Sequence, residues 1–366
     1  MGRISTFGQH LYEGRVSFDF IGRRKLFYVI SAVIVLVAAL AFVLRGFNLG
    51  VEFKGGVEFT AKVQVANAAS TDAMVQGVED AGVPDAGDPT VQTSGKDTIR
   101  IQTRALTQDE ATQVTASLKE AGATEVSQNL IGPTYGKQVA TKALTGLIVF
   151  LVIIVIFIWA YFREWRMSVA GIVALAHDLV ITAGVYALSG FEVTPATVTG
   201  LLTILGFSLY DTVVVFDKVR ENTKGILKSS SRTYAEQANL ALNQTLVRSI
   251  NTSITALLPV GALLFAGVFI LGTGPLKDLA LALFVGMLAG AYSSIFIATP
   301  LASQLKEREP AIKAQAARVL ARRAKEAEAP VAAGAAPSRP VQASGAAKRA
   351  QPSRKPRSQR GKGGSS

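Results

Sequence analysis

The most informative side chains in this sequence are two opposite charges that lie within long apolar runs. Asp211 is the one charge in the run from Thr194 to Phe216, and Arg248 lies near the start of the run from Leu246 to Leu271. A charge at membrane depth costs about 2.5–3.5 kcal/mol on insertion scales, so each of them needs a role. A carboxylate and a guanidinium at one depth on neighbouring helices neutralise each other, and a proton that binds the carboxylate breaks the pair. The pattern therefore predicts a two-state element that protonation drives.

Two further ionisable residues, His177 and Asp178, lie together in the middle of another apolar run. We assign them, with Asp211 and Arg248, to a candidate proton pathway. Simpler alternatives stay open, because Asp211 and Arg248 could form a static salt bridge, or Arg248 could extend to the cytoplasmic face. His177 and Asp178 could instead hydrogen-bond to polar groups of a neighbouring helix, for which the candidates are Thr199, Thr203 and Ser208. A carboxylate could also serve sodium in place of a proton.

Other kinds of chemistry lack their residues in this chain. There is no cysteine and there are only two histidines, which removes a disulfide framework and the usual ligands of zinc and iron–sulfur sites. There is no P-loop, no glycine-rich nucleotide fingerprint, no HExxH and no supported Ser-His-Asp arrangement. We therefore expect no enzymatic activity, no cofactor and no metal, and any work must be driven by ions or by a partner.

Six apolar runs of bilayer length must position these charges, since about 20 residues cross the hydrocarbon core. Hydrophobic residues make up 49% of the 366 residues and charged residues only 17%, against a usual charged share of about a quarter. A large soluble core does not give six such runs, and their abundance also excludes a disordered chain. We predict six membrane helices over the runs Leu26–Leu44, Ala143–Phe162, Met167–Leu188, Thr194–Phe216, Leu246–Leu271 and Leu279–Leu305.

These helices divide the chain into five parts. Residues 1–25 precede helix 1 (26–44), residues 45–140 form one long loop, residues 141–305 hold helices 2–6, and residues 306–366 form a tail. Lys and Arg gather at the ends of alternate connections, at Arg23, Arg24, Lys25, Arg163, Arg166, Lys218 and Arg220. Because basic residues mark the cytoplasmic side, we expect a multi-pass protein with both termini in the cytoplasm and residues 45–140 outside.

The long loop has the pattern of a folded α+β domain. Strands are predicted over Val57–Val65, Asp97–Thr103 and Glu125–Leu130. Helices are predicted over Thr71–Gly82, capped by Ser70 or Thr71, and over Thr107–Gly122, where Thr107 and Glu110 have the spacing of a capping box. The order β-α-β-α-β suggests a small extracytoplasmic domain of ferredoxin-like type.

Small residues and the tail complete the predictions. Gly206, Gly286 and Gly290 are candidates for close helix packing, for which ordinary membrane packing is the simplest explanation. The tail from Lys306 carries 15 basic and 4 acidic residues and should be disordered after about residue 330. Its charge predicts contact with anionic lipid. Ribosomal RNA and a solvated topology signal are the alternatives, and we expect no specific nucleic-acid partner.

Several stretches together resemble the SecF family, whose members belong to the bacterial SecD–SecF complex and are similar to the resistance-nodulation-division transporters. The resemblance covers about residues 16–305 and rests on Arg45–Gly56, Ile131–Thr134, Phe162–Arg166, Ala174–Asp178, Gly206–Asp211, Asp217–Asn222, Asn243–Arg248 and Ala291–Phe296. Phe53, Gly55 and Gly56 match the motif at the base of the outer domain. The chain departs from the family pattern at Glu52 and Lys54, where Asp and Thr are usual, and at Tyr210, where Asn is frequent.

This resemblance implies both an architecture and a role. The six helices would form half of a pseudo-twofold transporter in the bacterial inner membrane. With SecD, the chain would use the proton-motive force to assist late steps of protein export and membrane insertion through SecYEG, after the ATPase SecA. Its substrates would be unfolded exported polypeptides. Asp211 and Arg248 match the family's proton-transport residues.

Two other functions compete with this interpretation. The first is a non-transporting scaffold or holdase, in which the outer domain binds emerging chains while the membrane part braces the translocon. The second is half of a small-molecule exporter, which the single outer loop of modest length disfavours.

Overall fold

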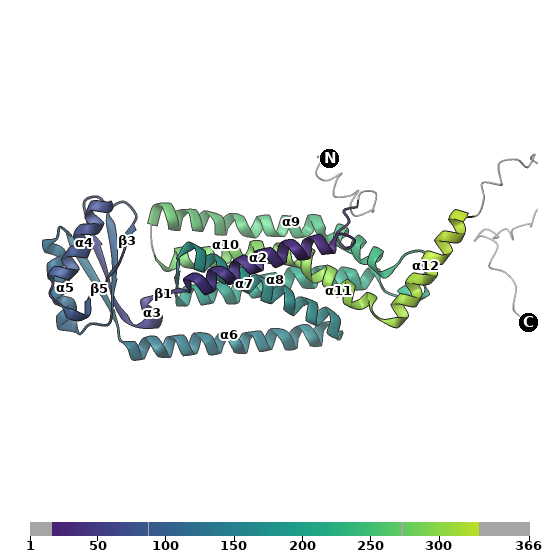
Figure 1. Ribbon diagram of the computed structural model, residues 1–366, viewed down its shortest axis with the longest axis horizontal. Helices are drawn as coiled ribbons and strands as arrows, with labels where there is room; N and C mark the ends of the chain where they lie inside the picture. Colours follow the sequence, from purple (N-terminus) through teal and green to yellow (C-terminus); the bar gives the residue numbers. More distant parts are fainter. Residues whose placement is uncertain (1–16, 87, 272–273, 329–366) are drawn as a thin grey trace, which may run out of the picture. The chain divides into compact units, whose positions relative to one another are not determined.

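The computed structural model describes residues 17–86, 88–271 and 274–328 (Figure 1). Within these ranges, six helical segments are long and apolar enough to cross a membrane, which confirms the six predicted membrane helices. They are α2 (Arg24–Arg45), α6 (Pro133–Phe162), α7 (Trp165–Ser189), α8 (Pro195–Asn222), α9 (Tyr234–Ala266) and the last span, which joins α10 (Pro275–Ser293) to α11 (Thr299–Glu307). The predicted disorder after residue 330 lies outside the described residues.

The helices differ in how much of their surface the rest of the protein covers. In an apolar 18-residue stretch of each helix, 61% of the last span and 50% of α7 is buried inside the protein, against 11% for α6 and 11% for α9. The polar residues of interest lie on the more covered helices α7, α8 and α10, together with one face of α9. In a membrane protein, such interior positions are where polar groups find partners other than lipid.

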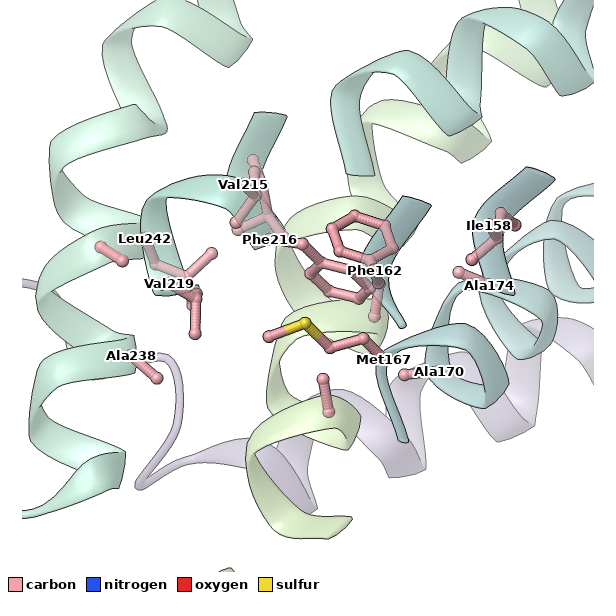
Figure 2. Close-up of a cluster of buried hydrophobic side chains, with 14 of the residues drawn as sticks. Ile158, Phe162, Met167, Ala170, Ala174, Val215, Phe216, Val219, Ala238 and Leu242 are labelled. Carbon is pink, nitrogen blue, oxygen red and sulfur yellow. The ribbon is translucent and has the colours of Figure 1, made fainter. Parts of the chain in front are cut away.

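The apolar core of the membrane part lies between α6, α7, α8, α9 and the last span (Figure 2). Phe162 ends α6 and packs edge-on against Phe216 of α8, with ring centroids 5.4 Å apart and planes at 71°. Met167 at the start of α7 and Leu242 of α9 belong to the same cluster. The aromatic pair holds the tight α6–α7 connection against α8, at the same end of the helices as Asp217.

Two segments of the membrane helices wind as π-helix. Gly267–Leu271 follows α9 directly, and Ser294–Ala298 (η4) joins α10 to α11. In η4, the Thr299 hydroxyl donates to the Ser294 carbonyl at 3.1 Å. Pro300 lacks an N–H group and so removes one donor from the helical ladder just after this segment. Such π-turns occur often at functional sites in helices.

The long loop folds as an α+β domain (residues 56–131), which has four strands. Its sheet has the order β3-β4-β2-β5, and every neighbouring pair is antiparallel. Apolar residues of β2 and β4, such as Phe59 and Ile101, point to the two helices, while Glu58, Arg100 and Gln102 lie on the opposite face. The elements are β2 (Gly56–Lys62), α4 (Ala68–Asp80), β3 (Thr90–Ser94), β4 (Thr98–Thr103), α5 (Gln108–Glu120) and β5 (Glu125–Ile131).

The domain matches the prediction in part. The capping box of Thr107 and Glu110 at the start of α5 is confirmed. The cap of α4 was wrong, because Asn67 is the N-cap and Ser70 completes its capping box from the third helical position. Asn caps a helix as well as Ser does, so the helix begins earlier than predicted. The strand Thr90–Ser94 was missed, since it has only one large apolar residue, Val91.

A short parallel ladder joins the α+β domain to the membrane helices. Strand β1 (Asn48–Leu49) pairs with β6 (Glu192–Val193), which is the connection between α7 and α8. The one-turn helix α3 (Val51–Lys54) follows β1 and leads into β2. The described residues up to Leu320 form one compact unit that includes this ladder, and the end of α12 (Pro310–Glu328) belongs to a second unit.

Candidate functional site

Asp178 lies in the interior of the helical bundle and is held by three neighbours. It is 1% exposed. Its Oδ2 atom accepts hydrogen bonds from the Ser208 hydroxyl at 2.6 Å and the Ser293 hydroxyl at 2.9 Å, while His177 Nδ1 lies 3.1 Å from Oδ1. Of the three candidate partners on the neighbouring helix, only Ser208 is used. Thr199 and Thr203 donate to carbonyls of their own helix, α8.

Asp211 has a second and similar environment one turn further along α8. Positions 208 and 211 share a face of the helix because they are three residues apart. Asp211 is 4% exposed, and it accepts a hydrogen bond from the Ser249 hydroxyl of α9 at 2.8 Å and another from the Ser294 hydroxyl. Each buried acid is therefore held by one serine of a neighbouring helix and one serine of the last span.

The two serines of the last span are consecutive and connect the two acids. Ser293 ends α10 and Ser294 begins η4, and both are fully buried. Successive residues of a helix point about 100° apart, so one serine can face α7 while the next faces α8. The polar groups Asp211, Ser294, Ser293, Asp178 and His177 therefore form a series within the bundle, which we call the relay, and Ser293 and Ser294 are joined in it through the backbone.

His177 closes this series at a less satisfied position. Its ring stacks on Tyr292 with centroids 6.0 Å apart, and its Nε2 atom is buried without a hydrogen-bond partner among the described residues. The ring lines a cavity of about 440 Å³ between α2 and α7, together with Tyr28 and Ser31. His177 is therefore the member of the series that combines an unpartnered buried nitrogen with a place in the cavity wall.

Arg248 does not pair with Asp211, contrary to the prediction. Its side chain is exposed, and Nη2 reaches the Tyr210 hydroxyl at 3.4 Å. The reason is geometric: Ser249 is the residue of α9 that faces Asp211, so the preceding residue points about 100° away, out of the bundle. Among the described residues, no carboxylate forms a salt bridge with Arg248.

Two of the three glycines predicted to allow close helix packing, Gly286 and Gly290, do lie at close helix contacts next to the relay. A Cβ atom at Gly290 would lie 2.9 Å from Ser208 Cβ, and one at Gly286 would lie 2.3 Å from Ile204 Cδ1. These glycines let α10 approach α8, which brings Ser293 within reach of Asp178. Gly206 differs, because a Cβ there would meet nothing within 4 Å.

The base motif packs against the start of α6. Gly55 has φ +77°, and its Cβ would lie 2.7 Å from Pro133 Cα, so the position requires glycine. Gly56 has φ +146° and a Cβ there would meet the Thr103 carbonyl at 2.5 Å. Phe53 lines an apolar cavity of about 310 Å³ between α6, α7 and α8. These residues are structural supports of the junction.

Sequence reasoning missed the serines of the site. Ser249, Ser293 and Ser294 supply three of the four hydroxyl donors to the two acids. The only signal that could have found them is their polarity within apolar runs. That signal is weak, because serine is uncharged. Among the described residues, no cluster of three or more His, Cys, Asp or Glu side chains could hold a metal ion.

Comparison with protein families gives two matches. The model described as "Protein export membrane protein SecD/SecF, C-terminal" matches residues 111–308, and the model "SecD/SecF GG Motif" matches residues 40–66. The first range contains all residues of the relay. The second contains Gly55 and Gly56.

Curated relatives carry the same family name. The chain is 49% identical over 328 residues to the protein translocase subunit SecF of Streptomyces coelicolor, covering 88% of this chain and 86% of the relative. It is 44% identical to SecF of Mycobacterium tuberculosis, covering 87% and 74%. It is 35% identical to the subunit SecDF of Thermus thermophilus, covering 82% of this chain and 40% of that protein.

A solved structure shares the fold. The crystal structure of SecDF, a translocon-associated membrane protein from Thermus thermophilus, superimposes with a TM-score of 0.71 at 30% identity. The match covers 84% of this chain and 40% of the SecDF chain. The chain thus spans about 40% of the length of the solved relative.

Proposed function

This chain belongs to the SecD/SecF family of protein-export membrane proteins, and from that premise we propose that it acts as a SecF-type subunit that couples a proton gradient to late steps of protein export. It is a non-enzymatic component of the Sec pathway. With a SecD-type partner, it assists export through the SecYEG channel after SecA has acted, and it also assists membrane insertion. Its substrates are unfolded polypeptides.

The observation that carries the proton role is the pair of buried acids joined through Ser293 and Ser294. Asp178 and Asp211 lie in the membrane spans and are nearly inaccessible. Hydroxyl groups both donate and accept, so each serine can follow the protonation state of the acid to which it is bonded, and the two serines are adjacent in the chain. One proton that moves inward across 100 mV supplies about 2.3 kcal/mol, so several cycles would serve one substrate.

The exposed position of Arg248 supports the proposal that a partner protein covers one side of α8 and α9. It lies with Tyr210 and Gly206 on a face that this chain leaves uncovered. A guanidinium that faces lipid is costly, so a second membrane protein should cover it. We assign this face to the SecD-type half, which the SecDF relative carries in the same chain. Arg248 then exchanges Tyr210 for an acid when the acid's proton leaves.

The finer architecture follows from the same premise. The β-α-β-β-α-β order and the sheet order β3-β4-β2-β5 support a ferredoxin-like α+β domain. The coverage of 40% of a SecDF chain supports half of a pseudo-twofold transporter. We place the protein in the bacterial inner membrane with both termini in the cytoplasm and the α+β domain outside. The basic tail then meets anionic lipid.

The proton role can be tested in proteoliposomes that contain SecYEG, SecA, a SecD partner and this chain. The measurement is export of a precursor protein with and without an imposed proton gradient. Asp211→Asn and Arg248→Met, each supplied with enough SecD partner to saturate assembly, should lose the gradient-dependent part of export. Asp217→Asn is the matched control, since Asp217 lies on the same helix, beyond the relay, where it accepts a hydrogen bond from Tyr161. Normal gradient stimulation in both Asp211→Asn and Arg248→Met would refute the proton role.

A sodium-coupled variant of the proposal is separated by the same assay. A sodium gradient at constant pH should give no stimulation of export. If it replaces the proton gradient, Asp211 serves sodium.

A second function, a holdase for emerging chains, is favoured by one observation. Strand β5 is an edge of the sheet, and Glu125, Ser127–Leu130 are exposed along it. An exposed edge can pair with an extended chain. Stimulation of export that is independent of any gradient, and that Asp211→Asn leaves intact, would support this function instead.

A further inference from the structure

The junction between the α+β domain and the α7–α8 connection contains a second group of buried charges, separate from the relay. Arg100 of β4 is 8% exposed. Its Nη2 atom forms an ion pair with Glu58 of β2 and a second one with Glu192 of β6, at 3.1 Å from Oε2. Gln102 Nε2 also donates to Glu192 at 3.1 Å. One strand of the α+β domain is thereby attached to the turn between the two helices that carry Asp178 and Asp211.

Helices α3 and α10 contribute further titratable groups to this junction. Helix α3 contributes Glu52, whose charge acts on Glu58, Arg100 and Glu192. Helix α10 contributes Lys277, whose ammonium group lies 4.5 Å from the centre of the Phe191 ring, and Asp278, which is 2% exposed. Both interact electrostatically with Glu192 and Arg100.

The charges at the junction do not balance. Glu52, Glu58, Glu192 and Asp278 are four acids, and Arg100 and Lys277 are two bases, which leaves two acids in excess. A buried carboxylate without a cation is costly, and it takes up a proton in preference to remaining charged.

Two acids of the junction have a buried carboxyl oxygen without a hydrogen-bond partner among the described residues. Glu192 is 4% exposed, and its Oε1 atom is buried without a hydrogen-bond partner among the described residues. Glu52 Oε2 is buried in the same unpartnered state. Burial raises the pKa of Glu52, and the charges of Glu58 and Glu192 raise it further against the opposing effect of Arg100. Burial lowers the pKa of Arg100, but the hydrogen bond and charge of Glu58, with the charge of Glu192, outweigh this and keep the guanidinium charged.

We propose that this junction is a proton-binding latch: the acids around Arg100 share a bound proton, and loss of that proton releases the α+β domain from the α7–α8 connection. The ligand is a proton from the solution on the side of the α+β domain, and Glu52 is one of its acceptors. This site lies apart from the relay, and its behaviour does not depend on the coupling proposed above.

The direction of the pH effect follows from linkage. The pKa of Glu52 is raised in the docked junction relative to a free carboxyl, so docking takes up a proton. The docked state is therefore fully favoured below the ordinary pKa of a glutamate, and it is lost as the pH rises through the raised pKa of Glu52. For one proton, the ratio of docked to undocked molecules falls by up to about tenfold per pH unit in this window.

The latch can be tested on the full chain in lipid nanodiscs at equal pH on both sides, without a partner or a substrate. The chain has no cysteine, so nitroxide labels at Gln113→Cys on α5 and Thr199→Cys on α8 report docking by electron–electron distance measurements. Labels at Thr90→Cys and Gln113→Cys report whether the α+β domain stays folded.

The expected result is a short distance between α5 and α8 at acidic pH that lengthens as the pH rises. Glu52→Gln, which imitates the protonated acid, should stay docked throughout. Glu125→Gln is the matched control, because Glu125 is an exposed acid of the same sheet, and it should behave as the unchanged chain. Arg100→Gln should be undocked at every pH with the domain still folded.

Three outcomes would overturn the latch. The first is docking in the unchanged chain that does not vary with pH. The second is a Glu52→Gln variant that follows pH as Glu125→Gln does. The third is an Arg100→Gln variant that remains docked. None of these results bears on gradient-driven export, which is measured separately.

Discussion

Ser293 and Ser294 are neighbours in the chain, yet they donate hydrogen bonds to different carboxylates, those of Asp178 and Asp211. The two acids belong to different helices, α7 and α8, so the last span contacts both of them, in addition to the direct hydrogen bond from Ser208 of α8 to Asp178. The π-turn that begins at Ser294 explains how one helix can serve both. A change in the protonation of either acid must alter the hydrogen bond of one serine and thereby the position of the other.

Removing the Ser294 hydroxyl should destabilise the chain, since it leaves one buried oxygen of Asp211 without its donor. We expect Ser294→Ala to lower the free energy of unfolding in mixed micelles by about 1–3 kcal/mol. Ser253→Ala is the control, because Ser253 is also buried but donates only to the Ser249 carbonyl of its own helix. Equal losses in both variants would contradict the role of Ser294 as a specific partner of Asp211.

Glycine positions on α8 and α10 should respond oppositely to the same substitution. Gly290→Ala places a Cβ 2.9 Å from Ser208 Cβ and should cost about 1–3 kcal/mol by overpacking. Gly206→Ala meets nothing within 4 Å and should be neutral or stabilising, by up to about 1 kcal/mol through helix propensity. Unfolding of the isolated full chain measures both. A costly Gly206→Ala would show that the open space at this position is filled in the free chain.

Arg248 should matter for assembly more than for the stability of the chain alone. Its side chain is exposed and has no carboxylate partner among the described residues, so Arg248→Met should change the free energy of unfolding of the isolated chain by less than about 0.5 kcal/mol. Titration of a SecD-type partner in nanodiscs should show weaker association. A large loss of stability without a partner would indicate an intrachain role that the structure does not show.

The capping box of α5 predicts a local and pH-dependent effect. Thr107→Ala should lower the protection of α5 amides from hydrogen exchange by about 1 kcal/mol, whereas Thr112→Ala, on the exposed surface of α5, should not lower it. The hydrogen bonds from the Thr107 backbone and hydroxyl lower the pKa of Glu110. The stabilisation of α5 by ionised Glu110 is therefore fully present above the ordinary pKa of a glutamate. It is lost as the pH falls through the lowered pKa of Glu110. Protection of α5 that does not change on acidification would contradict this.

The membrane helices could be predicted from the sequence because their signal is long and uncharged. The start of α9 could not, since it lies at Tyr234, twelve residues before the predicted apolar run. That extra length is polar, and it is stabilised by the cap at Thr233 and by Asn239 and Asn243, which hold the backbone of Phe18–Ile21. Such a segment is specified by tertiary contacts.

The site was predictable where charge marked it and not where geometry decided. Asp178 and Asp211 stood out through the cost of burying an acid. The pairing of Asp211 with Arg248 failed, because depth in the membrane was known from the sequence but the rotation of α9 was not. The roles of Ser249, Ser293 and Ser294 depend on that rotation and on the π-turn, which no local residue pattern specifies.

Through the two-residue ladder between β1 and β6, movement of the α+β domain would be coupled to movement of the helices that carry the relay. Strand β6 lies in the chain connection between α7 and α8, and its Glu192 is 14 residues after Asp178 and 19 residues before Asp211. At about 1.5 Å per helical residue, each acid is some 20–30 Å from the ladder. A stiff helix transmits axial displacement with little loss, so a small shift between α7 and α8 at the acids would reappear as a tilt of the sheet. Protonation of the acids and movement of the α+β domain would then be coupled mechanically through helices α7 and α8 and the β1–β6 ladder.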